Sequence, residues 1–222
     1  MNEAGRHEFE TLDSRTVYSG AIIALRVDHV AMPDGRTADR EVVEHHGAVA
    51  VVVLDDLDRL VLIHQYRHPV GRRLWEIPAG LLDAPGEDPL DAAQRELAEE
   101  TGLAAGKWSV LVDIALSPGF TDESVRVFLA EDLREVDRPE PEHEEADLEV
   151  ERIPLGEAVA MVLRGEIVNA TAVSGVMALA AMHSRPDSLR LLRAPDAPWA
   201  DRPVKFSERK RSHATGNRTT GS

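Results

Sequence analysis

Short apolar runs separated by turn residues dominate the first third of the chain. Residues 21–32 and 39–44 flank a Pro-Asp-Gly-Arg turn at 33–36, a pattern typical of a β-hairpin. Residues 47–54 and 59–65 flank an acidic turn and predict a second hairpin. The 47–54 run, GAVAVVVL, is almost wholly apolar, as expected for a strand that is covered on both faces.

Helical and strand patterns alternate in the rest of the chain. One helix can be delimited from its punctuation, with Asp88 as N-cap, Pro89 in the first turn and Gly102 as the left-handed terminator. The patterns predict further strands at 108–116, 124–130 and 148–153, and helices at 156–164 and 170–183. A mixed sheet with helices on both faces is the economical way to bury these elements, so we expect an α/β fold.

Composition limits the partners that this protein can have. The 222 residues are 43% hydrophobic and 29% charged, which is typical of a globular protein with a full core. No apolar run is long enough to span a membrane, and the acidic N-terminus does not have the pattern of a secretory signal. The net charge of −15 argues against nucleic-acid binding, and the lack of cysteine is compatible with a cytoplasmic location. We therefore expect neither a membrane nor a nucleic acid as partner.

The end of the chain differs from its body in charge. Residues 201–222 hold six Lys or Arg against Asp201 and Glu208, and few of them are apolar. Such a composition predicts a basic, disordered tail over residues 199–222.

Three glutamates stand at an unfavourable place on the predicted helix. Glu96, Glu99 and Glu100 lie near its C-terminal end, where the helix dipole is negative and where they also repel one another. Their i, i+3, i+4 spacing puts them on one stripe, and oxygen ligands on one rigid edge suit a hard divalent cation such as Mg²⁺. A solvated acidic face is the alternative for three glutamates taken alone.

The residues around the three glutamates resemble the Nudix box, the signature of hydrolases that split nucleoside diphosphates linked to another moiety. The family pattern is G-x5-E-x7-R-E-U-x-E-E-x-G-U, where U is a bulky aliphatic residue. Here it is matched by Gly80, Glu87, Arg95-Glu96-Leu97, Glu99-Glu100 and Gly102-Leu103. The chain departs from it at one point, because six residues instead of five separate Gly80 from Glu87. The extra residue falls in the 83–86 turn, where an insertion leaves the helix intact.

The resemblance implies a Nudix-type α/β/α sandwich with a mixed sheet. It covers roughly residues 45–183, and the segment before it is similar to the extra β-rich segment with which the ADP-ribose pyrophosphatase branch builds a homodimer. We therefore expect an N-terminal β-rich dimerisation segment at 1–45, a Nudix domain at 46–198 and the basic tail at 199–222.

Three further features are similar to that branch. Arg67, in Gln65-Tyr66-Arg67-His68-Pro69, would meet the phosphates or the terminal ribose of the substrate. Glu76 lies in the lead into the box, as does Ala79, whose carbonyl would join the metal ligands. Pro118 stands sixteen residues after Gly102, a spacing associated with activity on ADP-ribose. Each feature also has a structural explanation, such as a surface ion pair for Arg67 or a simple turn at Pro118.

The implied chemistry is metal-dependent. Glu96, Glu99 and Glu100, with the Ala79 carbonyl, would hold two or three Mg²⁺ or Mn²⁺ ions, while Arg95 orients the glutamates. Glu99 and Arg95 are thereby predicted catalytic residues, and Glu87 is predicted to have a supporting role.

The general base is expected on the acidic loop at 139–145. Glu142, Glu144 and Glu145 all qualify, and Glu142 is preferred because it stands furthest from the next strand.

The resemblance implies hydrolysis of ADP-ribose to AMP and ribose 5-phosphate. Arg40, His45 and Tyr66 are the residues considered for binding adenine, with structural roles as the alternative. Two other functions stay open: hydrolysis of another nucleoside diphosphate derivative, such as a nucleotide sugar, a dinucleotide or an oxidised nucleotide, and ligand sensing without catalysis.

Overall fold

The computed structural model describes residues 9–84, 86–138, 148–185 and 187–216, and the chain divides into two compact units. The first unit combines Met1–His46, Ala115–Glu123 and Pro203–Ser222, and the second combines Gly47–Ile114 and Ser124–Arg202. The expected boundary near residue 45 is thus close to the observed one. The division differs in that the 115–123 segment and the C-terminal residues belong with the N-terminal segment.

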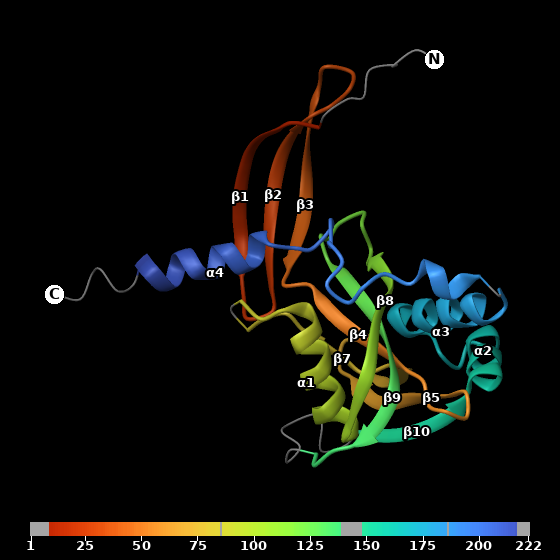
Figure 1. Cartoon of the computed structure of the whole chain (residues 1–222). Coiled ribbons are helices and arrows are strands. Elements are labelled where there is room, and N and C mark those ends of the chain that lie inside the picture. The colour runs from red at the N-terminus through yellow and green to blue at the C-terminus, as the bar shows by residue number, and fades with distance from the viewer. Residues whose placement is uncertain (1–8, 85, 139–147, 186, 217–222) are drawn as a thin grey trace. The chain divides into compact units, whose positions relative to one another are not determined.

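A three-stranded sheet forms the first unit (Figure 1). Its strands are β1 (Thr11–Ser19), β2 (Ile23–Ala31) and β3 (Thr37–His45). The predicted hairpin is confirmed, because β2 pairs with β3 in antiparallel register from Ile23↔His45 to Ala31↔Thr37. Gly35 has a φ of 79°, which suits glycine in the connecting turn. Strand β1 was not predicted, because all nine of its residues are exposed and no hydrophobic alternation marks it.

The C-terminal residues of the same unit form helix α4 (Lys205–Gly216). Its Phe206 is fully buried, and Arg209 donates two hydrogen bonds of 2.9 and 3.0 Å to the carboxylate of Glu44 on β3. The predicted disorder of the tail is therefore wrong for residues 205–216. One buried aromatic ring and one buried ion pair stabilise a segment whose average composition is polar.

The remaining elements of the described residues form two sheets, three α-helices and a short 3₁₀ helix. They are β4 (Ala48–Val53), β5 (Arg59–Arg67), β6 (Arg72–Glu76), β7 (Ala79–Leu81), α1 (Pro89–Thr101), β8 (Leu103–Ala115), β9 (Ser124–Glu135), β10 (Glu149–Pro154), α2 (Leu155–Leu163), α3 (Ala170–His183) and η2 (Ser188–Leu191). One sheet has the order β7-β4-β9-β8 and is mixed, because β4 runs parallel to β9 and antiparallel to β7. The other is antiparallel, with the order β10-β5-β6.

The predicted hairpin of residues 47–54 and 59–65 is only partly formed. The turn closes, with Asp55 N–H donating to the Arg59 carbonyl, but the strands share only one isolated bridge, Leu54↔Leu60. Strand β4 lies in the mixed sheet and β5 in the antiparallel one. Strand β9 pairs with all of β4 and β7 with its first three residues, whereas β5 pairs with β6 and β10.

Helices α1 and α3 cover opposite faces of the mixed sheet (Figure 1). Val49, Val51 and Val53 share a buried cluster with Leu97 of α1. Val52 points to the other face of the sheet, as alternate residues of a strand do. It lies against α3, because a Cβ added to Gly175 of α3 would come within 2.7 Å of the Val52 side chain. The predicted α/β/α sandwich is confirmed, and it sets α1 firmly against the sheet.

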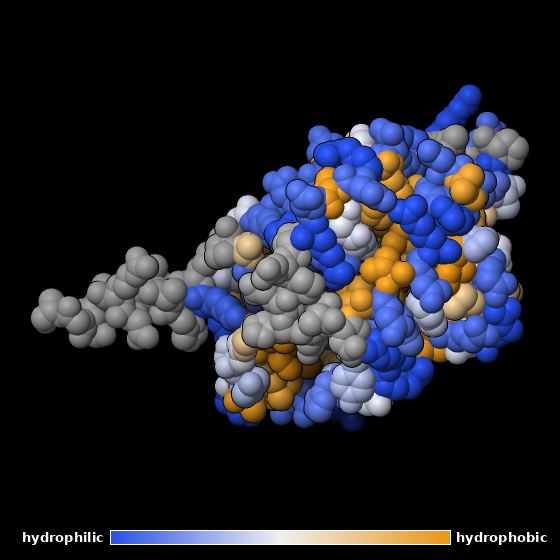
Figure 2. Space-filling view, turned by 90° about the horizontal axis from the view of Figure 1, so that it is seen from below, coloured by the Kyte–Doolittle hydropathy of each residue, from blue (hydrophilic) through white to orange (hydrophobic). Residues whose placement is uncertain are grey.

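Hydrophilic residues predominate on the face drawn in Figure 2, with hydrophobic ones in smaller areas between them. Within the described residues, no helix is long and apolar enough to cross a bilayer.

Candidate active site

Both predicted ends of α1 are confirmed. The Asp88 carboxylate accepts a 2.9 Å hydrogen bond from the Leu90 N–H, and Pro89 opens the first turn. At the other end Gly102 has a φ of 68°, and its N–H donates to the Ala98 carbonyl. The last turn of α1 contains no basic residue, so no cation within that turn opposes the helix dipole beside Glu99 and Glu100.

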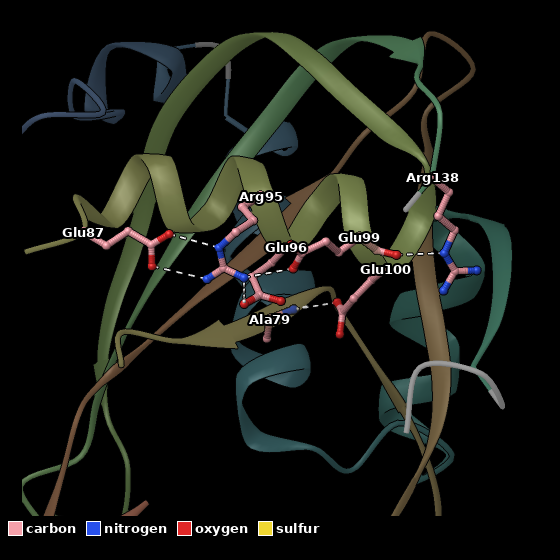
Figure 3. A network of polar contacts seen from close by, with 7 residues as sticks. All are labelled: Ala79, Glu87, Arg95, Glu96, Glu99, Glu100 and Arg138. Carbon is pink, nitrogen blue, oxygen red and sulfur yellow. Dashed lines mark hydrogen bonds and ion pairs between the residues drawn. The ribbon is translucent and has the colours of Figure 1, made fainter. Parts of the chain in front are cut away.

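Arg95 connects three carboxylates (Figure 3). It donates two hydrogen bonds of 3.0 and 3.2 Å to Glu87, and its Nη1 lies 2.7 Å from Glu96 and 2.9 Å from Glu99. The hydrogen bonds that Arg95 donates to Glu87, with the charge of Glu96, raise the pKa of Arg95 despite its partial burial, so this cation is permanent. Glu87, which lies just before α1, is thereby tied to the acids at the other end of the helix.

Strand β7 packs against the same acids. The Ala79 N–H donates a 3.0 Å hydrogen bond to Oε2 of Glu100, whose side chain is almost fully buried. A Cβ on Gly80 would overlap the carboxylate of Glu96, so only glycine fits there without a shift. The extra residue between Gly80 and Glu87 therefore leaves Gly80 against the helix.

The donor set is compatible with a hard divalent cation. Glu87, Glu96, Glu99 and Glu100 offer only carboxylate oxygens, and Arg95 is the one cation of the box among them. The carboxylates are not gathered into a ready-made site, since no three acid or histidine side chains among the described residues are placed to hold one ion. The carboxylates are apart because Arg95 binds those of Glu96 and Glu99, while the carboxylate of Glu100 accepts a hydrogen bond from the Ala79 N–H.

A second polar cluster lies at the β5–β6 pairing. Arg67 donates bonds of 3.0 and 2.7 Å to the two oxygens of Glu76, and Gln65 donates a third of 3.3 Å to the same carboxylate. Glu76 is only 2% exposed, so it is a buried partner of Arg67 and not a solvated strand residue. Because the bidentate pair fixes the guanidinium, Arg67 has a defined orientation on this sheet.

Arg40 and Pro118 belong to the first unit. Arg40 is exposed on β3 and donates to the neighbouring Asp39 carbonyl. Pro118 is exposed in a turn whose first residue, Ser117, has a φ of 45°. The turn is fastened to β3, because the Val43 N–H donates to the Phe120 carbonyl at 2.7 Å.

The two other residues considered for adenine differ in exposure. His45 is nearly buried, and its N–H donates to Asp122 at 2.9 Å. Tyr66 is 48% exposed.

Glu142, Glu144 and Glu145 lie outside the described residues.

Two residues at the site or near Pro118 were not singled out from the sequence. Arg138 donates a 2.7 Å hydrogen bond to the backbone carbonyl of Glu99, and Asp122 anchors the Pro118 turn to β3. Neither belongs to a recognisable motif, and both contacts join residues far apart in the chain, so no local pattern could have indicated them.

Two family models match the chain. The model described as "NUDIX domain" matches residues 44–172, and the model described as "Nucleoside diphosphate sugar hydrolase N-terminal domain" matches residues 9–43. The border between the two models falls at the end of β3, close to the border between the compact units.

Relatives of known name match most of the chain. The ADP-ribose pyrophosphatase of Mycobacterium tuberculosis is 54% identical over 204 residues, which are 92% of this chain and 97% of that protein. The ADP-ribose pyrophosphatase of Bacillus subtilis is 39% identical, covering 73% and 88%. The methanol dehydrogenase activator of Bacillus methanolicus is 36% identical, covering 78% and 92%.

A solved structure shares the fold. The crystal structure of an ADP compounds hydrolase superposes with a TM-score of 0.70 at 23% identity, covering 82% of this chain and 97% of that one.

Proposed function

Because the chain belongs to the Nudix hydrolase family, we propose that it hydrolyses the diphosphate linkage of ADP-ribose to AMP and ribose 5-phosphate. The observation that carries the proposal is a group of four carboxylates, three of them bound by Arg95 and the fourth, Glu100, by the Ala79 N–H, with Gly80 against Glu96. Two relatives named ADP-ribose pyrophosphatase, at 54% and 39% identity, support this choice of substrate.

The cofactor we propose is Mg²⁺ or Mn²⁺, held by Glu96, Glu99 and Glu100 with the Ala79 carbonyl. When bound, such an ion would neutralise phosphate oxygens and lower the pKa of a water molecule. The chain's own contribution is orientation. Arg95 holds Glu96 and Glu99 from one side, and the Ala79 N–H holds Glu100 from the other.

For substrate binding we propose Arg67, Glu76, Arg40 and Pro118. Glu76 keeps the planar guanidinium of Arg67 in place through two hydrogen bonds, and this guanidinium would meet the anionic diphosphate or the terminal ribose. Arg40 and Pro118 are proposed from the resemblance, and the Pro118 turn is fixed to β3.

Glu142 is the general base that we propose, with Glu144 and Glu145 as the alternatives. Their glutamine variants would separate the three, because loss of the base lowers kcat while KM changes little.

A homodimer assembled through the first unit is also proposed. The support is a group of exposed apolar side chains on and next to the exposed strand β1: Phe9, Leu12, Val17, Tyr18 and Ile22. Sedimentation at micromolar concentration would reveal the dimer, and a monomer would refute it.

We propose the cytoplasm as the location of this protein, since a chain without cysteine needs no oxidising compartment.

Substrate competition tests the proposed activity. Purified protein with Mg²⁺ should cleave ADP-ribose with a kcat/KM at least about tenfold above that for sugar nucleotides, dinucleotides and oxidised nucleotides, a difference of about 1.4 kcal/mol. A smaller preference would contradict the narrow assignment. Complete inactivity with either metal would favour ligand sensing.

One observation favours a second substrate class. The model that matches residues 9–43 is described as the N-terminal domain of nucleoside diphosphate sugar hydrolases. Sugar nucleotides such as ADP-glucose share the diphosphate and the adenosine, so they belong in the same competition experiment as the most informative rivals.

A further inference from the structure

A cation from outside α1 contacts the backbone of its last turn. Glu96, Glu99 and Glu100 lie in or near this turn, and the turn itself contains no basic residue. The Nε of Arg138, three residues beyond the end of β9, donates a 2.7 Å hydrogen bond to the backbone carbonyl of Glu99 (Figure 3). A cation at a helix C-terminus opposes the negative end of the dipole, so Arg138 stabilises the turn in which the acids sit.

The carbonyls of this turn are satisfied one by one. Thr101 Oγ1 donates to the Leu97 carbonyl, and the Gly102 N–H donates to that of Ala98. The Glu99 carbonyl would be the next orphan of the helix end, and Arg138 is its donor. The Val136 N–H in turn donates to the Gly102 carbonyl at 2.9 Å, so the segment that carries Arg138 is itself bound to the end of α1.

Glu99 is therefore held at both of its ends by arginines. Arg95 contacts its carboxylate at 2.9 Å, and Arg138 contacts its backbone carbonyl at 2.7 Å. A side chain whose backbone and head group are both fixed has little freedom to turn. The neighbouring Glu100 shares the same turn, so its backbone is fixed by the same contact.

The burial of Arg138 does not serve stability alone. Its Nη2 is buried and has no hydrogen-bond partner among the described residues. An unsatisfied buried donor lowers stability, which offsets what the bond to Glu99 contributes. Such a group in a native site calls for an explanation other than stability.

We propose that Arg138 is a positioning residue, which fixes the last turn of α1 so that Glu99 and Glu100 can hold the divalent cation. The proposal rests on the proposed metal-dependent function of the same site, but it concerns metal binding by the free protein and not the identity of the substrate.

Binding of Mn²⁺ to the substrate-free protein tests the proposal, with the electron paramagnetic resonance signal of free Mn²⁺ as the readout. Loss of a cation beside an acidic cluster would by electrostatics alone tighten metal binding. Loss of positioning would weaken it. The sign of the change therefore separates the two effects.

For Arg138→Gln we expect Mn²⁺ binding about tenfold weaker than in the wild type. Arg138→Lys keeps the charge without the planar guanidinium, so its affinity should fall between those of the wild type and Arg138→Gln. Arg134→Gln is the matched control, because Arg134 is an exposed arginine on the same segment and its loss removes the same charge. Its Mn²⁺ affinity should stay within about twofold of the wild type or become slightly tighter.

Unchanged or tighter Mn²⁺ binding by folded Arg138→Gln would overturn the proposal. If Arg138→Gln does not fold, the comparison of Arg138→Lys with the wild type decides, and equal affinities would overturn the proposal as well. A wild type that binds Mn²⁺ but leaves ADP-ribose intact would refute the proposed function and leave the role of Arg138 standing.

Discussion

Arg95 donates two hydrogen bonds to Glu87, a residue that precedes the first turn of the helix on which Arg95 lies. The contact spans eight positions of the chain and ties the entry of α1 to the acids near its exit. Arg95 reaches Glu96 and Glu99 with its remaining nitrogen. A single side chain thus sets the mutual orientation of three carboxylates in the box.

Arg95→Lys should therefore damage activity although it keeps the charge. A lysine ammonium is a point charge and cannot reproduce the planar set of contacts to Glu87, Glu96 and Glu99. We expect kcat/KM for ADP-ribose to fall roughly 10–100-fold, the range seen when residues that orient metal ligands are replaced. Arg164→Lys is the control, because Arg164 also pairs with two glutamates but at the C-cap of α2. Equal activity of the two variants would contradict the assigned role of Arg95.

Gly80→Ala should disturb the site through one methyl group. Its Cβ would overlap the Glu96 carboxylate, so either β7 or that side chain must shift. We expect kcat/KM to fall at least about tenfold, since small displacements at a catalytic centre have large effects. The control is Gly156→Ala on α2, where a Cβ would have open space and helix propensity favours alanine. Undiminished activity of Gly80→Ala would show that the site is more plastic than the structure indicates.

Phe206→Ala should destabilise the first unit. Phe206 is fully buried and packs edge-on against His46 at a ring separation of 4.5 Å. Truncation of a buried phenylalanine lowers the free energy of unfolding by about 3–5 kcal/mol. Val204→Ala, at a position 49% exposed, should change it by about 0.5 kcal/mol or less. Chemical denaturation measures both, and equal effects would mean that α4 does not stabilise the unit.

Asp122→Asn should raise stability at neutral pH. Burial, with a further contribution from Glu44, raises the pKa of Asp122, so the folded protein binds its proton more tightly than the unfolded chain. The contribution of Asp122 to the stability of the wild type is then highest below the unfolded pKa, about 3.9. It falls as the pH rises through the folded value.

Asparagine keeps the oxygen that accepts the His45 N–H and removes the buried charge. The melting temperature of Asp122→Asn should exceed that of the wild type at pH 7. The gap should narrow as the pH is lowered toward about 3.9. A difference in melting temperature that does not change with pH would contradict the raised pKa of Asp122.

The sequence predicts well what depends on neighbouring residues. Asp88, Pro89 and Gly102 delimit α1 because caps and terminators act within a few positions of the helix end. The β2–β3 hairpin was predictable for the same reason, since its turn lies between two adjacent strands.

The contacts between residues far apart in the chain were not predictable. Strand β4 pairs with β7 and β9 and not with β5, which the turn between them does not reveal. Helix α4 was not predicted because the average composition of its segment is polar. The burial of the single residue Phe206, which helps to stabilise the helix, does not show in that average. Arg138 contacts Glu99, which is 39 residues away in the chain. In the sequence it is one basic residue in an acidic segment, and nothing near it indicates this contact.

Turnover of ADP-ribose as a function of added Mg²⁺ tests the central claim most directly. The wild type should release AMP and ribose 5-phosphate only with the metal, and Glu100→Gln should release neither at a comparable rate. Asp91→Asn, an exposed acid at the other end of α1, is the matched control and should behave as the wild type. Full turnover in the presence of a chelator, or undiminished turnover by Glu100→Gln, would contradict the claim that these carboxylates hold the catalytic metal.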